Sequence, residues 1–442
     1  MIEKNTIILN QLASDRSDLV GFSRFLNNDK ITPEKLIESA IERCGQLVDG
    51  RNVLVINDTT DFNFGHHYNY MDAGDEHLGP MCNEGEMGFY LHPGLVVDAE
   101  DGMGLGFSYI KIWNRKHGKG NKHDRNYFQL PLKEKESYRW IECGIESKKN
   151  LSKAGHLTII ANRESDIYQE FVMLPDDKTD LIIRSCQNRC LEDSDTKLYE
   201  TLSEVPSYGD YRLKVRANLK GEREARDTVM EVRYKKVRIK KPSTVKDKSL
   251  PDYTEVYAVE AKERSGLTPS TGKPICWRLL TTYSIDQIED ALKIIQWYGR
   301  RWQIELLFGT LKSKGLNFEA SEVESGGGLK NLCIIGLQVA LKINQLSQGR
   351  NNEQKQSAAI SFTTEQTVVL KALLGHFEGK TEKQKNHYKE GTLAWAAWVI
   401  ARMGGWKGYA SESKPGNKTM RIGLMKLESI TLGWKLAQKI CA

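Results

Sequence analysis

The chain has 442 residues and a mass of 50.3 kDa, enough for two or three domains with a sizeable buried core. This excludes a peptide-scale or disordered protein. A formal net charge of +6 and a pI of about 8.7 are compatible with nucleic-acid binding and also with many ordinary enzymes. The overall charge therefore leaves the function open.

Cysteine usage and hydropathy indicate a reducing compartment. The absence of any CxxC pair predicts free thiols rather than disulfides or a zinc site. The first residues lack the apolar core of a signal peptide, and no run of about 18 apolar residues occurs. We therefore expect a cytoplasmic protein without a membrane partner.

Residues 1–50 are predicted to form short helices. The apolar residues between Leu19 and Leu26 are helically spaced. Thr32 followed by Pro33 is typical of a helix start with proline in its first turn.

A short apolar run from Asn52 to Asn57 ends in Asp58. The run is typical of a buried strand in a mixed sheet, and an aspartate at the end of such a strand is well placed to hold a metal ion in a cleft. A turn-forming aspartate is the alternative interpretation. Between Met87 and Trp113 the pattern predicts two further strands joined by an acidic, glycine-rich turn. Strand, turn and strand after a first acid are typical of the opening of an RNase H-like sheet.

The segment from His156 to Tyr168 is predicted to be a buried strand that runs into a helix, with Asn162 at the junction. A second apolar run follows and ends at Arg184-Ser185. Both runs suit the interior of the same sheet.

From Tyr211 to Tyr283, strand-like runs alternate with joints rich in lysine, proline and glycine, which predicts an all-β insertion. Its apolar residues change phase at Lys235-Lys236, as a β-bulge would produce. Tyr211 to Lys246 holds 13 Lys/Arg against 4 Asp/Glu, a net charge of +9. This basic face fits binding of the DNA phosphate backbone, with a steep salt dependence. A solvated sheet face is the alternative.

Asp286 to Lys314 is predicted to be one amphipathic helix. Tyr298, Arg301, Glu305 and Lys312 share one stripe roughly 60° wide on it, so a carboxylate is flanked by a phenol and two cations. A neighbouring apolar stripe is the expected packing face, and it consists of Ile288, Leu292, Ile295, Trp302 and Leu306.

The C-terminal part is predicted to be helical. A glycine triplet, Gly326–Gly328, is expected to break the chain before a helix over Leu329–Leu346. A later helix over Leu393–Gly405 should end in a glycine cap, with its tryptophans in the core.

The spacing Tyr298-x2-Arg301-x3-Glu305-x6-Lys312 matches the Y-R-E-K signature of bacterial DDE transposases of insertion-sequence-four type, the branch that includes the transposon-five enzyme. The D-T-T setting of Asp58 and the C-terminal helices also resemble this family, and the resemblance covers nearly the whole chain from about residue 20.

The resemblance implies an α/β fold, with an RNase H-like mixed-sheet catalytic core, an all-β insertion and helical terminal regions. The expected regions are a shortened helical N-terminal region at 1–50, a core at 51–185 and 276–325, a β-rich basic insertion at 186–275 and a helical dimerisation region at 326–442. In the family, further residues upstream form a module that recognises the terminal repeats, so that function is in doubt here.

The resemblance also implies a set of site residues. Asp58, the residue at position 162 and Glu305 would be the catalytic metal ligands, holding two Mg²⁺ ions, or Mn²⁺ as a substitute, roughly 3.5–4 Å apart. DNA phosphates would be bound by Tyr298, Arg301 and Lys312 and, with less weight, by Arg184 together with Arg189.

Asn162 departs from the family pattern D-R-E-x-D-I, whose first aspartate is the second catalytic ligand. Two divalent ions need anionic oxygens to bind, and asparagine offers one neutral carbonyl oxygen. Glu164 and Asp166 are nearby candidates for a substitute ligand, but Asp166 lies roughly 6 Å further along the predicted helix and should not reach the same ion without rearrangement. The sequence therefore predicts impaired catalysis.

Three functions stay open. The first is a cut-and-paste transposase that nicks DNA hydrolytically, forms hairpins and transfers strands. It would act on transposon ends and target DNA as a homodimer at the bacterial nucleoid. The second is a non-catalytic DNA-binding regulator or inhibitor of transposition. The third is a structure-specific nuclease on the same fold.

Overall fold

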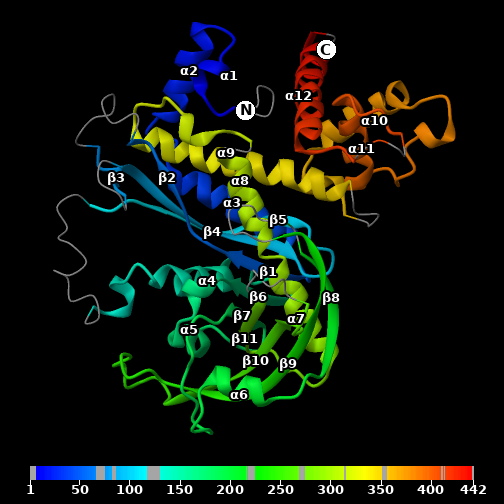
Figure 1. Ribbon diagram of the computed structural model, residues 1–442. Coiled ribbons are helices and arrows are strands. Elements are labelled where there is room, and N and C mark those ends of the chain that lie inside the picture. The colour runs from blue at the N-terminus through cyan, green and yellow to red at the C-terminus, as the bar shows by residue number, and fades with distance from the viewer. Residues whose placement is uncertain are drawn as a thin grey trace. The chain divides into compact units, whose positions relative to one another are not determined.

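The computed structural model describes residues 6–65, 75–81, 86–116, 130–215, 217, 224–267, 274–312, 315–350, 356–409, 412 and 414–440. The chain divides into two compact units (Figure 1). Unit 1 comprises Met1–Val48, Thr59–Lys119 and Gln303–Ala442, and unit 2 comprises Asp49–Asp58 and Gly120–Trp302. Within the described ranges, no helix has the length and apolar composition needed to cross a membrane.

Unit 2 contains a mixed sheet with the strand order β1-β6-β7-β11-β10-β9-β8. β1 pairs with β6 and β6 with β7 in parallel, and the remaining neighbours are antiparallel. The strands are β1 (Asn52–Asn57), β6 (His156–Ala161), β7 (Thr179–Arg184), β8 (Gly209–Val215), β9 (Arg226–Lys240), β10 (Tyr253–Glu263) and β11 (Cys276–Thr281).

The helices of unit 2 connect or flank these strands. α4 contacts both β1 and α5, while α6 and α7 contact β9. Their bounds are α4 (Tyr138–Asn150), α5 (Tyr168–Met173), α6 (Leu198–Glu204) and α7 (Ile288–Gly299), with short 3-10 turns η3 (Leu132–Glu134) and η4 (Arg163–Ser165).

Unit 1 has an antiparallel sheet in which β4 pairs with β2, β3 and β5. The strands are β2 (Thr60–Asn63), β3 (Gly79–Pro80), β4 (Met87–Asp98) and β5 (Gly104–Trp113). Unit 1 combines an antiparallel sheet with helices, and unit 2 combines a partly parallel sheet with helices. The predicted mixed α/β fold is thus confirmed, and it is consistent with an RNase H-like core.

The helices of unit 1 gather around α9, which contacts α2, α3, β5, α11 and α12 (Figure 1). They are α1 (Leu9–Leu12), α2 (Arg16–Leu26), α3 (Pro33–Leu47), α8 (Trp302–Leu311), α9 (Gly326–Gly349), α10 (Thr364–Phe377), α11 (Leu393–Met403) and α12 (Asn417–Ile440), with 3-10 turns η6 (Phe318–Ala320), η7 (Ala358–Ile360) and η8 (Glu382–Gln384).

The predicted helix starts and ends are confirmed at two places. α3 begins at Pro33, and the side chain of Thr32 accepts a hydrogen bond from the N–H of Lys35. α11 ends at Met403 with Gly404 as its C-cap, and the following Gly405 has a positive φ of 91°, which glycine adopts without strain. Trp395 and Trp398 are buried, as expected.

The segment 286–314 was predicted to be one helix, and its residues 313–314 lie outside the described residues. The prediction is wrong, because α7 ends at Gly299 and α8 begins at Trp302. Arg300 and Arg301 each donate a backbone hydrogen bond to the carbonyl three residues earlier, which tightens the turn and changes the phase of the following helix. Trp302 and Leu306, expected in the packing face, are consequently 57% and 54% exposed. α8 instead buries Ile304, Leu307, Phe308 and Leu311.

The glycine triplet is the first turn of α9 and not a break. Ser325 caps this helix by accepting a hydrogen bond from the N–H of Gly328. Glycine is required at 326 because an added Cβ would lie 2.8 Å from the Cβ of His77.

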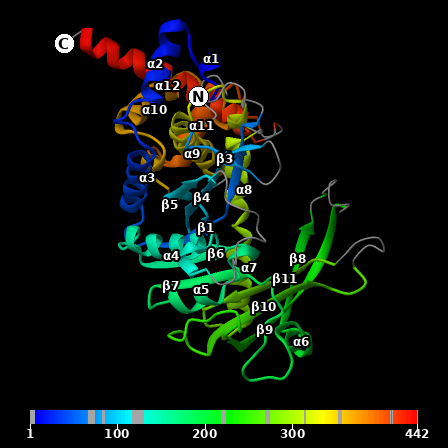
Figure 2. The same ribbon diagram turned by 90° about the vertical axis from the view of Figure 1, so that its left-hand side faces the viewer.

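The phase change in β9 is not a β-bulge. Its register against β10 is continuous through Lys235 and Lys236. Figure 2 shows β9 and β10 as long neighbouring strands. Buried positions are even-numbered up to Val232 and odd-numbered from Val237. Because neighbouring residues of a strand face opposite sides, the strand changes which face is covered.

The close contact between α3 and β5 gives a test of unit 1. An added Cβ at Gly106 would lie 2.6 Å from the Cβ of Cys44, so we expect Gly106→Ala to reduce the free energy of unfolding by about 1–3 kcal/mol. Gly21→Ala in α2 is the control, since nothing lies within 4 Å of its added Cβ and alanine favours a helix. Denaturant unfolding measures both, and equal stability of the two variants would contradict the packing.

Candidate active site

Two parallel strands place Asp58 and Asn162 side by side. β1 ends at Asn57 and β6 at Ala161, and their register pairs Ile56 with Ile160. The residues that follow both strands therefore lie at the same edge of the sheet. Asn162 Nδ2 donates a hydrogen bond of 2.9 Å to Asp58 Oδ1.

The amide of Asn162 is bound at both ends. Its Oδ1 accepts a hydrogen bond of 2.8 Å from the N–H of Glu164 and thereby caps η4. A reversed amide would set two donors against each other at Glu164 and two oxygens against each other at Asp58. Asn162 consequently presents a donor, and not a ligand oxygen, to Asp58.

The other oxygen of Asp58 contacts Arg301. Arg301 Nη1 lies 2.8 Å from Asp58 Oδ2, and both side chains are 15% exposed. A guanidinium and an amide NH₂ therefore bind the same carboxylate from two sides, which stabilises its charge. Arg301 stands in the turn between α7 and α8, so the interruption of the predicted helix occurs at a site residue.

Tyr298, the first residue of the predicted stripe, is 5% exposed. Its ring meets that of Trp277 edge to face, with 6.3 Å between ring centroids. In this structure Tyr298 is thus a packing residue of unit 2.

Glu305 and Lys312 belong to unit 1, on α8 and just after it. Glu305 is partly exposed in the first turn of the helix, where its charge is favourable to the helix dipole. Lys312 Nζ lies 3.5 Å from Asp61 Oδ1 and 3.8 Å from Glu319 Oε1, and it covers the ring of Phe62.

Arg184 lines a small polar cavity of about 240 Å³ in unit 2, together with Arg163 and Arg278. Arg278 is fixed by a 2.8 Å bond to Glu260 and by the ring of Tyr199, 4.1 Å below its guanidinium. In the described part of the chain, Arg163 and Arg184 form no ion pair. Sequence reasoning missed Arg163 and Arg278; the position of Arg163 directly after Asn162 was the available signal.

Arg189, expected near DNA, is instead a structural residue. It is buried and its Nε donates a 2.9 Å hydrogen bond to Asp166 Oδ1. The other Asp166 oxygen accepts hydrogen bonds from the N–H groups of Cys186 and Gln187. Asp166 is therefore turned into the protein and is held there by Arg189 and the two backbone N–H groups.

A buried glutamate supports the same turn. Glu170 Oε2 accepts a 2.6 Å hydrogen bond from Ser165 Oγ, and Glu170 is fully buried. Burial, opposed by that hydrogen bond and assisted by the nearby charge of Asp166, raises the pKa of Glu170 to about 8. Glu170 is therefore protonated at neutral pH.

Residues 52–340 match the family model described as the transposase DDE domain, which spans more than half of the chain. The chain belongs to the DDE transposase family. Family membership implies DNA as the substrate, nuclease and strand-transfer chemistry at the level of the family, and divalent metal ions as the usual cofactor of that chemistry. It also agrees with the mixed α/β fold.

The residues around Asp58 do not fit the divalent ions that the DDE family uses. Each Asp58 oxygen already faces a donor, and Asn162 offers an NH₂ group where a ligand oxygen is needed. Within the described ranges, no group of three or more His, Cys, Asp or Glu side chains could hold a metal ion. We therefore derive no reaction step through a metal ion at this site.

Many basic residues of the segment Tyr211–Lys246 form ion pairs with acidic residues that lie outside this segment in the sequence. Glu255 on β10 lies opposite Arg238 in the register and pairs with both Lys236 and Arg238. Further pairs are Arg226–Glu263, Lys240–Glu192 and Lys241–Asp252. The exposed basic residues of this segment without a paired acid in the described part of the chain are Arg212, Lys214, Lys235 and Lys246.

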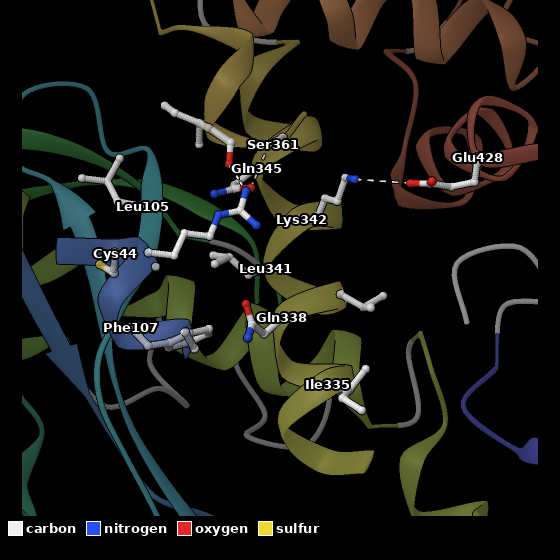
Figure 3. A pocket seen from close by; sticks show the side chains of 15 residues that line it. Cys44, Leu105, Phe107, Ile335, Gln338, Leu341, Lys342, Gln345, Ser361 and Glu428 are labelled. Carbon is white, nitrogen blue, oxygen red and sulfur yellow. Dashed lines mark hydrogen bonds and ion pairs between the residues drawn. The ribbon is translucent and has the colours of Figure 1, made fainter. Parts of the chain in front are cut away.

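A separate cavity of about 350 Å³ lies in unit 1 between α3, β5, α9 and α12 (Figure 3). Its walls include Phe107, Leu105 and the Lys342–Glu428 pair, whose N–O distance is 3.5 Å. Gln345 is bonded to Ser361 and to the carbonyl of Gly104. Because these polar groups satisfy one another, we assign this cavity no function.

The Asp58–Asn162 contact predicts a metal-dependent stability for one variant. Asn162→Asp would set a carboxylate oxygen where Nδ2 now lies, 2.9 Å from Asp58 Oδ1. We expect a loss of about 2 kcal/mol from like-charge repulsion at neutral pH, equivalent to roughly 1.5 pKa units. Millimolar Mg²⁺ should restore the unfolding temperature of this variant and leave the native chain unchanged.

Asn188→Asp is the matched control, because Asn188 also donates to a carboxylate, Glu200, but at the surface. We expect neither a comparable loss nor a rescue by Mg²⁺ there, since water screens the repulsion. Rescue of both variants, or of neither, in thermal unfolding would contradict the account of Asn162.

The raised pKa of Glu170 predicts a pH-dependent stability. The unfolded carboxyl loses its proton near pH 4.5 and the folded one only near pH 8, so the folded state binds more protons between these values. Stability should fall as pH rises through this window, by at most about 1.4 kcal/mol per pH unit. Glu170→Gln should flatten the profile measured by thermal unfolding. Glu164→Gln is the control, since Glu164 is an exposed partner of Arg139. An unchanged pH profile of stability in the Glu170→Gln variant would contradict the raised pKa of Glu170.

Proposed function

We propose that the chain is a DNA transposase of insertion-sequence-four type whose cleavage activity is impaired by Asn162. The observation that carries this proposal is the contact of Asn162 with Asp58 at the adjacent ends of two parallel strands. Family membership supports the DNA transposition, and the Y-R-E-K spacing of the sequence supports the insertion-sequence-four type. The proposed catalytic positions are Asp58, Asn162 and Glu305, and they would hold metal ions once position 162 carries an aspartate.

The proposed phosphate ligands are Arg184, Arg301, Lys312 and Tyr298. The cavity beside Arg184 supports this, because Arg163 and Arg184, which form no ion pair among the described residues, both line it, and a guanidinium binds phosphate oxygens in a bidentate manner. Arg301 and Lys312 are each paired with an aspartate. A phosphate must therefore compete with Asp58 or Asp61, and Tyr298 must become exposed.

We further propose that two copies pair through the C-terminal region, 326–442. The second half of α12 supports this, since its apolar side chains are exposed rather than packed within unit 1. They are Ile430, Leu432, Trp434, Leu436 and Ile440. A second copy that covers this face would bury apolar surface, which is the usual driving force of a stable dimer.

The remaining proposed regions are 1–50 as the N-terminal helices, 51–185 with 276–325 as the catalytic core, and 186–275 as the β-rich insertion. The insertion proposal is supported by β8, β9 and β10, which extend the sheet of unit 2 beyond β11. Arg212 and Lys214 on β8 are its proposed DNA contacts. Such a protein would act at the bacterial nucleoid, where its DNA lies.

A second candidate function is a regulator or inhibitor of transposition that binds DNA without cleaving it. The hydrogen bond from Asn162 to Asp58 favours it, because this bond satisfies Asp58 without the cation that cleavage chemistry uses. Specific DNA binding without cleavage distinguishes this candidate from a transposase with residual activity.

Cleavage of DNA that carries the element's own ends tests the proposal. We expect Asn162→Asp to nick the ends and form hairpins in Mg²⁺ or Mn²⁺, at least about a hundredfold faster than the native chain, since a ligand charge is restored. The double variant Asn162→Asp with Asp58→Asn is the control, because it has the same net charge as the native chain and should not cleave.

Residual cleavage by the native chain supports the first function, and binding without any cleavage supports the second. If the native chain cleaves as fast as the Asn162→Asp variant, the role given to Asn162 is wrong. If the double variant cleaves like the single one, the site is not at Asp58.

A further inference from the structure

A basic, aromatic cavity of about 530 Å³ lies in the C-terminal part of unit 1, and none of the proposed catalytic or phosphate-binding residues lines it. It is formed by the loop that follows η8, the start of α11 and the turn after α11. Its lining includes Lys383, Lys385, Lys389, Tyr388, Trp398 and Trp406. Neither the family match nor the sequence pattern assigns this cavity a role.

The charges of the cavity favour an anion. Lys385 pairs with Glu382, whereas Lys383 and Lys389 have no ion pair in the described part of the chain. The described residues of the lining include no carboxylate. The neighbouring acids bind elsewhere: Glu390 pairs with Lys371 at 2.7 Å, and Glu378 accepts a hydrogen bond from the N–H of Asn386.

The aromatic side chains add flat apolar surface beside those cations. Trp398 is 8% exposed, and the guanidinium of Arg402 covers its ring at 5.6 Å. Tyr388 and Trp406 are half-buried, so their rings are the accessible ones. The indole N–H of Trp406 meets no acceptor among the described residues. Lysine beside such rings is the usual composition of a site for single-stranded nucleic acid, in which each stacked base contributes about 1–3 kcal/mol.

The cavity is held in shape by hydrogen bonds from buried or half-buried side chains. Arg402 donates to the carbonyls of Phe377, Trp406 and Lys407. Asn386 Nδ2 donates to the carbonyl of Trp395. A preformed site loses less conformational entropy when it binds, which favours a real ligand over an incidental hollow.

We propose that this cavity binds a nucleotide of a single DNA strand, with the phosphate at Lys383 and Lys389 and the base against Tyr388 or Trp406. Bases of an intact duplex are stacked and paired inside it, so their faces cannot reach these rings. The inference rests on the proposed action of the chain on DNA. It adds a second contact with DNA, in which an unpaired nucleotide is recognised by the C-terminal region.

The test is binding of fluorescently labelled oligothymidylate to the full chain, followed by anisotropy. We expect Lys383→Glu with Lys389→Glu to weaken binding at least tenfold and to reduce its salt dependence, because two phosphate contacts are lost. Lys380→Glu with Lys407→Glu is the matched control. It makes the same charge change at exposed residues nearby that do not line the cavity, and its effect should stay below threefold.

Tyr388→Leu should weaken oligothymidylate binding while leaving its salt dependence unchanged, since it removes a ring and no charge. Thermal unfolding confirms that each variant is folded. Equal losses in the cavity variant and the charge control, or no effect of either, would overturn the cavity assignment. Displacement of the oligonucleotide by an equal concentration of thymidine monophosphate would show a free-nucleotide site and overturn the assignment to a strand.

Binding of duplex transposon ends is measured in the same samples to separate this inference from the proposed function. If the variant Lys383→Glu with Lys389→Glu still binds the duplex ends but loses oligothymidylate binding, the inference is supported. Duplex binding by a native chain that binds no oligothymidylate overturns the inference alone. Absence of binding to either DNA overturns both.

Discussion

The carboxylate of Asp58 is neutralised from within the protein, and the rest of the site depends on this. Parallel pairing of β1 and β6 fixes the residues at 58 and 162 next to each other whatever their type. Two carboxylates at that spacing repel each other and require a cation between them. One carboxylate and one amide form a hydrogen bond instead, and Arg301 completes the neutralisation. A single side chain therefore decides whether this pair of strand ends needs a metal ion.

The surroundings leave Asn162 little freedom to rearrange. Its oxygen caps η4, and the residues after this turn are anchored by the buried Asp166–Arg189 pair and by the Ser165–Glu170 hydrogen bond. A buried ion pair contributes little net stability but is costly to break, so it holds the turn in one geometry. Asn162 is thus fixed by its backbone as well as by its side chain, and a ligand oxygen cannot be supplied there by a small local shift.

The sequence allowed the strands and the strand-end residues to be predicted, because buried strands leave continuous apolar runs and Asp58 and Asn162 follow them directly. It did not allow the interruption at Arg300 and Arg301 to be predicted. A turn closed by two backbone hydrogen bonds leaves no mark on side-chain periodicity. The prediction of which α8 residues face the core was therefore wrong. The net charge of the segment Tyr211–Lys246 was also misleading. It does not show which acidic residues lie across the sheet, and Glu255 becomes a neighbour of Arg238 only through the register of β9 and β10. Arg189 was likewise expected near DNA, because the sequence does not show that it pairs with the buried Asp166.

Mn²⁺ binding, followed by the electron paramagnetic resonance signal of the free ion, tests most directly whether Asn162 stands in place of a cation. We predict that the native chain binds no Mn²⁺ at submillimolar concentration through Asp58, and that Asn162→Asp creates such binding. Tight Mn²⁺ binding by the native chain that is abolished by Asp58→Asn would contradict the account.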